Sequence, residues 1–180
     1  FYEEQYKVFV GKWGYVTHCE WIDIDANTGT LTFYLEPGYY DDFAFDFNWT
    51  INSSAPVGVF ERAIPLGSVT SPFEDSDADC SRYCYIPENL ATSDIADGDV
   101  DCGFTQIRTP LMDLSGYTDP YIHYERWFYT QPNGDSLEVS IFDGQAILYF
   151  DSQDYDSAAM ATWISKDVRI LDYTPNLSSI

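Results

Sequence analysis

Two alternating runs of aspartate are the part of this sequence best suited to chemistry. Residues 75–79 read Asp-Ser-Asp-Ala-Asp, and residues 97–101 read Asp-Gly-Asp-Val-Asp. Carboxylate oxygens are typical calcium ligands. An EF-hand is excluded, because the position that requires Glu falls on Ile86 or Arg108 and the required glycine is absent. The runs therefore indicate either a solvated, self-repelling surface or divalent-cation sites of another kind.

Patterns typical of catalysis are missing from the chain. There is no Gly-x-Ser-x-Gly elbow, no His-Glu-x-x-His helix and no Walker loop. A glycosidase pair is defined by the separation of two carboxylates in space, and with so many acids no pair stands out. We therefore predict that the chain is not an enzyme and that its function is structural or depends on binding.

The cysteines indicate the redox compartment. There are four of them, an even number, at Cys19, Cys80, Cys84 and Cys102. We expect disulfides in an oxidising, extracellular setting, with buried thiols as the alternative. Four cysteines permit three pairings, and the sequence does not choose among them. Zinc is not expected, because no second Cys or His pair has ligand spacing.

The charge of the chain excludes several partners. Thirty acidic residues against eight basic ones give a net charge of −22. Nucleic acid and anionic lipid both require Lys and Arg, so neither is an expected partner. No run approaches the ~20 apolar residues that cross a bilayer, so membrane insertion is not expected. The chain begins at Phe1 instead of Met, which is typical of a processed mature protein or of a fragment.

Aromatic residues and alternation predict the elements that must position these groups. The 15 Tyr, 12 Phe and 5 Trp favour strands, so we predict an all-β fold. The longest alternating run, residues 121–129, places His123 and Glu125 on one face, and aromatic side chains on both faces predict a central strand. Shorter runs at residues 6–10, 19–25 and 31–35 are separated by turn signals, and residues 38–46 are interpreted as a linker.

The first 40 residues resemble the second half of a carboxypeptidase regulatory-like domain, of the transthyretin-like or Cna-B-like kind. The resemblance rests on VGKWGYVT and IDIDANTGTLTFYLEP, which follow that family's pattern of a Gly-Tyr strand, a hairpin and a closing strand. It implies a small Ig-like β unit at residues 1–40 whose early strands are missing.

Residues 41–180 resemble the MAM-like jelly-roll module of secreted bacterial proteins, including zinc carboxypeptidases. The segments that carry this resemblance, in order, are WTINSSAPVGVFERAIPLG, YCYIPENL, DGDVDCGFTQIRTPLMDLSGYTDPYIHYERWFY, SLEVSIFDG with its Asp-Gly hairpin, and WISKDVRILDYTP. The resemblance implies a jelly-roll β-sandwich of about eight strands. It also implies a calcium site at one edge, built from Glu61, Asp99 and Asp101, with Asp75 or Asp77 as further ligands. Cys102 stands where the family has glycine, which favours a disulfide at that loop.

Short glycosylation signals are scattered along the chain. Asn48, Asn52 and Asn176 begin Asn-x-Ser/Thr sequons. Ser136 and Ser157 lie in Asp-Ser-apolar triplets that resemble the O-glycosylation signal of Bacteroidota. These matches predict covalent glycans, although triplets this short also arise by chance in a chain rich in Asp.

We expect the chain to be an extracellular structural protein, a subunit of a surface filament made of its own copies. The jelly-roll pattern normally continues beyond residues 163–175, so we expect an open apolar groove at that end. We expect the alternating face of Tyr2, Tyr6, Val8 and Val10 to insert as a strand into the next copy. The alternatives are an accessory module of a secreted hydrolase, a carbohydrate-binding module, and a fragment whose missing strands lie elsewhere in the same polypeptide.

Overall fold

The computed structural model describes residues 4–94, 99–132, 134–156 and 160–180. The strands are β1 (Glu4–Val10), β2 (His18–Ile24), β3 (Thr50–Ser53), β4 (Phe60–Ala63), β5 (Cys84–Pro87), β6 (Thr105–Arg108), β7 (Tyr121–Trp127), β8 (Leu137–Phe142), β9 (Ile147–Gln153) and β10 (Trp163–Arg169). A single 3-10 turn, η1 (Ile170–Asp172), is the one helical element of the described residues. The all-β prediction is therefore confirmed. No helix in the described ranges is long and apolar enough to cross a membrane.

The strands pair as antiparallel two-stranded sheets, an arrangement consistent with a β-sandwich. β1 pairs with β2, and the eight strands from β3 to β10 form the body. In the body β4–β5 lies within the connection between β3 and its partner β6, and β8–β9 lies within the connection between β7 and its partner β10. The β8–β9 hairpin turns at Asp143, whose Oδ1 accepts from the backbone N–H of Ala146 (2.9 Å), and at Gly144, whose φ of 85° suits glycine.

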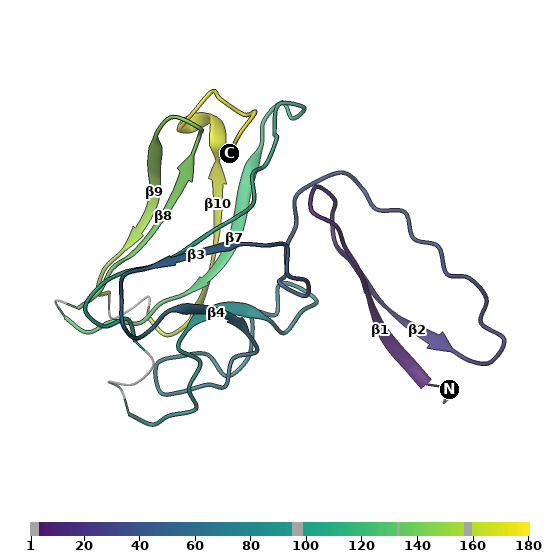
Figure 1. The fold of residues 1–180 in the computed structure, drawn as a ribbon, viewed down its shortest axis with the longest axis horizontal. Helices are drawn as coiled ribbons and strands as arrows, with labels where there is room; N and C mark the ends of the chain where they lie inside the picture. Colours follow the sequence, from purple (N-terminus) through teal and green to yellow (C-terminus); the bar gives the residue numbers. More distant parts are fainter. Residues whose placement is uncertain (1–3, 95–98, 133, 157–159) are drawn as a thin grey trace.

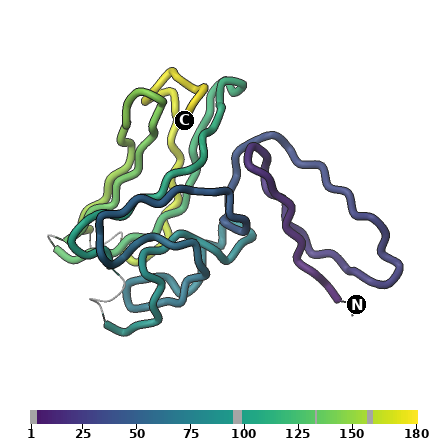
Figure 2. Tube along the Cα trace, viewed as in Figure 1, coloured from purple at the N-terminus to yellow at the C-terminus, as the bar shows by residue number. Residues whose placement is uncertain are grey.

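Residues 4–37 form an arm that projects from the body (Figures 1 and 2). The turn between β1 and β2 lies next to the body, and β2 runs away from the body. Residues 25–37 then return to the body alongside the hairpin. This return segment is attached at its end, where Val16 N–H donates to the carbonyl of Glu36 (2.9 Å). The prediction of a strand at residues 31–35 is wrong. The only β-bridge of the return segment joins Pro37 to Tyr15, and residues 31–35 form no β-pairing.

The segment expected to leave as an exchange strand is already paired. Tyr6, Val8 and Val10 belong to β1, which pairs with β2 along its whole length from Glu4 to Val10. Tyr2 lies outside the described residues. Insertion of residues 1–10 alone into a second copy would therefore require the hairpin to open first.

β7 confirms the predicted alternation but not the predicted position in a sheet. Ile122, Tyr124 and Arg126 are more buried than Tyr121 and His123. Among the described strands, β7 pairs with β10 alone, so the prediction of a central strand is wrong. Apolar side chains on both faces do not by themselves place a strand in the middle of a sheet, because a central strand also requires partners at both edges.

The apolar core lies at the C-terminal end of the body. Its buried residues are Leu114, Ile141, Ile170 and Ile180. The backbone of Ile180 exchanges two hydrogen bonds with Met112, of 2.7 and 3.0 Å. The C-terminal residues therefore pack into the core, where we had expected an open groove.

Residues 38–46 belong to the body, contrary to the predicted linker. Tyr39 packs against the core, and the Asp42 side chain is 1% exposed. Asp41 Oδ2 accepts from the Trp49 indole N–H (2.8 Å). This segment brings acidic side chains into the interior.

Candidate functional site: an acidic pocket between the arm and the body

The loop at residues 68–83 is held against β7 and β10 by two tryptophans. Trp127 Nε1 donates to the carbonyl of Thr70 (2.7 Å), and Trp163 Nε1 donates to that of Glu74 (3.3 Å). The two indole rings pack edge to face with centroids 5.8 Å apart. These tryptophans and Trp49 are half-buried, and their N–H groups position acidic segments.

The same loop anchors the arm. Cys80 forms a disulfide with Cys19 of β2, and its carbonyl accepts from Lys7 Nζ of β1. Cys84 is buried and Cys102 is exposed, and both carry free thiols. One disulfide is thus present, and the disulfide expected at Cys102 is not formed.

A cavity of about 340 Å³ opens where the arm meets this loop. Three aspartates of the predicted run line it, Asp75, Asp77 and Asp79, together with Lys7 from the arm and Arg82. The charged side chains of the cavity wall are therefore mainly acidic.

The buried carboxyls around this cavity hold protons more tightly than usual. Burial raises the pKa of Asp75 to about 6, and the charges of Asp79 and Asp42 add to the effect. Burial likewise raises the pKa of Asp79 to about 6, with Asp42 as a further cause and Lys7 opposing it. Burial also raises the pKa of Asp41 to about 6, although the hydrogen bonds from Phe43 N–H and Trp49 act to lower that pKa. A half-buried cluster of like charges thus lies beside the arm.

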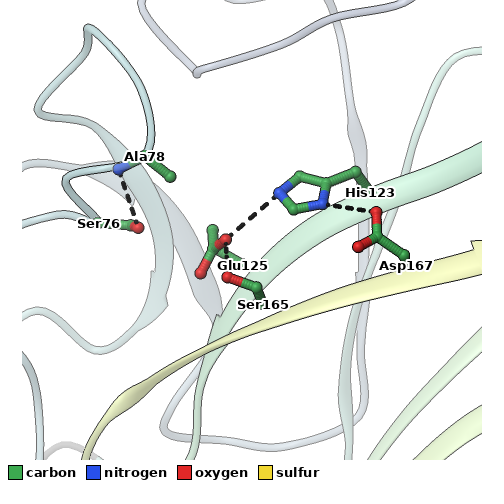
Figure 3. Close-up of polar contacts among 6 residues, drawn as sticks. All are labelled: Ser76, Ala78, His123, Glu125, Ser165 and Asp167. Atoms are coloured by element: carbon green, nitrogen blue, oxygen red, sulfur yellow. Dashed lines mark hydrogen bonds and ion pairs between the residues drawn. The ribbon is translucent and has the colours of Figure 1, made fainter.

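A second polar group lies on the neighbouring face of β7 and β10 (Figure 3). His123 Nδ1 donates to Asp167 Oδ1 (2.9 Å), and its Nε2 lies 3.3 Å from Glu125 Oε1. Ser165 Oγ donates to the same Glu125 oxygen (2.5 Å). The strand register explains these contacts, because His123 faces Asp167 and Glu125 faces Ser165 as direct cross-strand pairs.

This strand face lacks the hydrogen bond between serine and histidine that a serine nucleophile requires. A Ser nucleophile requires its hydroxyl to be hydrogen-bonded to the base, with a further group orienting that base. Here the serine hydroxyl is bonded to Glu125, while the imidazole is bonded to Asp167. The group is therefore a cross-strand polar ladder at the border of the acidic pocket, where the charge of Glu125 adds to the raised pKa of Asp79.

The predicted calcium residues make several separate contacts in the structure. Glu61 Oε1 accepts from the backbone N–H of Asn89 (3.0 Å), and Asp101 forms a bridge with Val57. Asp75 and Asp77 line the acidic pocket instead. Within the described ranges, no group of three or more His, Cys, Asp or Glu side chains is arranged to hold a metal ion. Calcium at the jelly-roll edge stays a prediction.

The glycosylation candidates differ in accessibility. Asn48, Asn52 and Ser136 are exposed. Asn176 is half-buried, and its amide donates to the carbonyl of Asp143 (2.5 Å). Ser157 lies outside the described residues.

Sequence reasoning missed two acidic residues, Asp41 and Asp42, which do not line the pocket but take part in its electrostatics. Both lie in the predicted linker, a segment that carries Gly and several Asp residues. The available signal was the pair of adjacent carboxylates among Tyr39, Tyr40 and Phe43, since aromatic neighbours indicate burial.

Comparison of the chain with known protein families, with curated proteins and with solved structures finds no match. The resemblances to a MAM-like module and to a carboxypeptidase regulatory-like domain therefore remain predictions.

Proposed function

We propose that this chain is a non-catalytic extracellular structural subunit that joins copies of itself head to tail through the arm, residues 4–37. The observation that carries the proposal is that the arm, which projects from the body (Figure 1), exposes large apolar side chains. Trp21 is 61% exposed, Leu31 42% and Tyr34 92%. Burying one such side chain is worth about 1.5–3 kcal/mol, so a contact that covers all of them gains substantial free energy.

Unpaired strand edges supply the second part of the argument. β1 and β2 pair only with each other among the described strands, so each keeps one edge without a strand partner. The two-stranded sheets of the body likewise keep edges of this kind. Pairing of an arm edge with a body edge of another copy would add backbone hydrogen bonds to the apolar contact. Because donor and acceptor surfaces differ, repetition of this contact produces a fibre.

The strands of the arm that would pair with another copy, β1 and β2, belong to a hairpin that is tethered to its own body. The disulfide of Cys19 to Cys80 keeps the hairpin next to its own body, so the arm acts as a fixed projection. A disulfide persists in oxidising compartments, which supports an extracellular location. The exposed positions of Asn48, Asn52 and Ser136 leave room for the covalent glycans that we propose there.

The test is self-association of the full chain with and without the arm's aromatic side chains. We expect the native protein to form oligomers or filaments, seen by sedimentation and by negative-stain microscopy. The variant Trp21→Ser/Tyr34→Ser should weaken association by about tenfold or more, since each tenfold step corresponds to about 1.4 kcal/mol. Tyr117→Ser is the control, because Tyr117 is exposed in a turn of the body.

Two results would contradict the proposal. One is equal association of the arm variant and the Tyr117→Ser control. The other is a native protein that stays monomeric at high concentration but binds polysaccharide through Trp21 and Tyr34, which would favour the carbohydrate-binding alternative.

A further inference from the structure

Residues 30–35 have the sequence of a strand but no strand partner in the described part of the chain. They read Thr-Leu-Thr-Phe-Tyr-Leu, and β-branched and aromatic residues are enriched in strands. The bridge of the return segment lies beyond them, at Pro37. Among the described residues, no backbone–backbone hydrogen bond involves residues 29–35. The N–H and C=O groups of this segment can therefore pair with a second strand.

The side chains of this segment are largely uncovered as well. Tyr34 is 92% exposed, and Leu31 is 42% exposed. Phe33 is half-buried, and its ring lies near that of His18 in β2, with centroids 5.9 Å apart. Figure 2 shows that the segment belongs to the projecting arm. An unpaired, apolar segment of this kind is a template for pairing with another chain.

The charge of the arm favours this segment over the neighbouring strands. Residues 26–35 carry no charged side chain. By contrast, β1 and β2 carry the acidic residues Glu4, Glu20 and Asp23. Each copy has a net charge of −22, so two copies repel each other least where the approaching segment is neutral. Residues 26–35 are therefore the part of the arm best suited to approach a second copy.

The body edge that fits this segment best is that of β9. Among the described strands β9 pairs with β8 alone, and residues 147–150 at its start are uncharged. Ile147 is 48% exposed and Tyr149 is 60% exposed. Both lie on one face of the strand, where Phe142 of β8 is paired with Ile147. This apolar strip can receive Tyr34 as a cross-strand neighbour.

The arm and β9 lie at opposite ends of the molecule. In Figure 1 the arm projects from one side of the body, and β8 and β9 lie at the far side. The arm of one copy therefore does not reach its own β9. A contact between two different ends repeats from copy to copy without closing, and such a contact produces a fibre.

We propose that residues 30–35 of one copy add as a strand to the free edge of β9 in the next copy. The inference rests on the proposed self-assembly through the arm. It names a further pairing segment of the arm, beside the edges of β1 and β2, and the body edge that receives it. In strand addition the main-chain hydrogen bonds supply affinity, and the alternate side chains supply specificity.

Proline substitution tests the backbone contact. Successive N–H groups of a strand point to opposite edges, so Thr32→Pro/Phe33→Pro removes a donor from whichever edge pairs. Thr32→Ala/Phe33→Ala is the matched control, because it removes the same side chains but keeps both N–H groups. We expect the proline variant of the full chain to associate about tenfold or more weakly than the alanine variant, as measured by sedimentation velocity.

The stability of dilute samples separates assembly from folding. Residues 29–35 make no backbone–backbone hydrogen bond within the described chain, so the proline and alanine variants should have the same Tm as monomers. In the native protein, hydrogen exchange measured by mass spectrometry should show protection of residues 30–35 that rises with protein concentration. Protection of β9 should rise in parallel.

The variant Ile147→Ser/Tyr149→Ser tests the acceptor edge. Both side chains are exposed, so their loss should leave the Tm of the monomer unchanged and weaken association. Combined with the proline variant, it should cause little further loss, because both changes remove the same contact. Tyr117→Ser is again the control and should associate as the native protein does.

Three results would overturn the proposal. The first is equal association of the proline and alanine variants. The second is protection of residues 30–35 that does not depend on concentration, which would place the segment against β2 of its own chain. The third is native association in Ile147→Ser/Tyr149→Ser.

Failure of this inference differs from failure of the assembly proposal. If Trp21→Ser/Tyr34→Ser reduces association but the proline variant matches its alanine control, the arm contact stands and strand pairing is rejected. If the native protein stays monomeric at high concentration, both are rejected.

Discussion

Asp151 shows how single residues organise the interior of the body. Its Oδ2 accepts from Tyr124 Oη (2.6 Å) and from Arg126 Nε (2.8 Å). Arg126 also donates to Gln153, and the Arg126 and Asp151 side chains are 10% and 11% exposed. Burial acts to raise the pKa of Asp151, but the hydrogen bonds from Tyr124 and Arg126 outweigh it and leave that pKa below its ordinary 3.8.

The first prediction concerns Asp151→Asn. We expect a loss of about 3–5 kcal/mol in the free energy of unfolding, because the variant leaves the Arg126 charge buried without its partner. Urea denaturation at neutral pH measures the loss. Asp154→Asn is the control, since Asp154 is exposed in the following loop. Equal effects of the two variants would contradict this role of Asp151.

The pH dependence of the same interaction has a definite sign. A carboxyl whose folded pKa lies below its unfolded pKa stabilises the protein above the unfolded value. Stabilisation by Asp151 is therefore fully present above about pH 4, and it is lost as the pH falls through the folded pKa. The Asp151→Asn variant should lack this part of the acid dependence.

At the scale of elements, the loop at residues 68–83 connects parts of the chain that lack regular pairing with each other. It bonds to β7 and β10 through the indole N–H groups of Trp127 and Trp163. It is bonded to the arm through Cys80. The arm makes a further contact with the body where Trp13 Nε1 donates to the carbonyl of Leu111 (3.0 Å). The position of the arm therefore depends on a few side chains.

The second prediction concerns removal of the disulfide between Cys19 and Cys80, which connects the arm to the loop at residues 68–83. Cys19→Ser/Cys80→Ser should lower the free energy of unfolding by about 2–4 kcal/mol, because the disulfide spans 61 residues of the unfolded chain. Hydrogen exchange of β1 and β2 should rise more than that of β7 and β10. Thermal and urea unfolding, with exchange measured by mass spectrometry, check both expectations.

Cys102→Ser is the matched control for this experiment. Cys102 carries an exposed free thiol, so its substitution should leave stability and exchange unchanged. A control that destabilises the protein as much as the double variant would show that cysteine substitution in general, and not the disulfide, accounts for the effect.

At the scale of the whole molecule, charge opposes the assembly that the arm favours. Each copy carries a net charge of −22, so two copies repel until salt screens them. The screening length is about 10 Å at 0.1 M salt and about 3 Å at 1 M. Apolar and backbone contacts are not weakened by this screening.

The third prediction is that salt promotes self-association. Raising sodium chloride from about 0.05 to about 0.5 M should lower the dissociation constant, because repulsion is screened while the arm contact remains. Sedimentation velocity measures the change, with Trp21→Ser/Tyr34→Ser as the control that should associate more weakly than the native protein at each salt concentration. Association that weakens with salt would indicate a contact built on ion pairs and would count against the arm.

Properties with a local cause followed from the sequence alone. The all-β class, the alternation of residues 121–127 and the turn at Asp143 and Gly144 depend on neighbours a few positions away. Side-chain period and turn chemistry are set at that range, so they can be inferred without knowing the partners of a strand. The acidic character of the chain is likewise a property of composition.

Tertiary structure decided which distant residues meet. The sequence permitted three cysteine pairings, and the fold joins Cys19 to Cys80 across 61 residues while Cys84 and Cys102 remain thiols. It left residues 31–35 without a strand partner, although their local pattern favoured a strand. It placed Asp42 in the interior, where its charge adds to the raised pKa of Asp75. Edge pairing and burial depend on contacts between segments far apart in the chain, and no local pattern encodes those contacts.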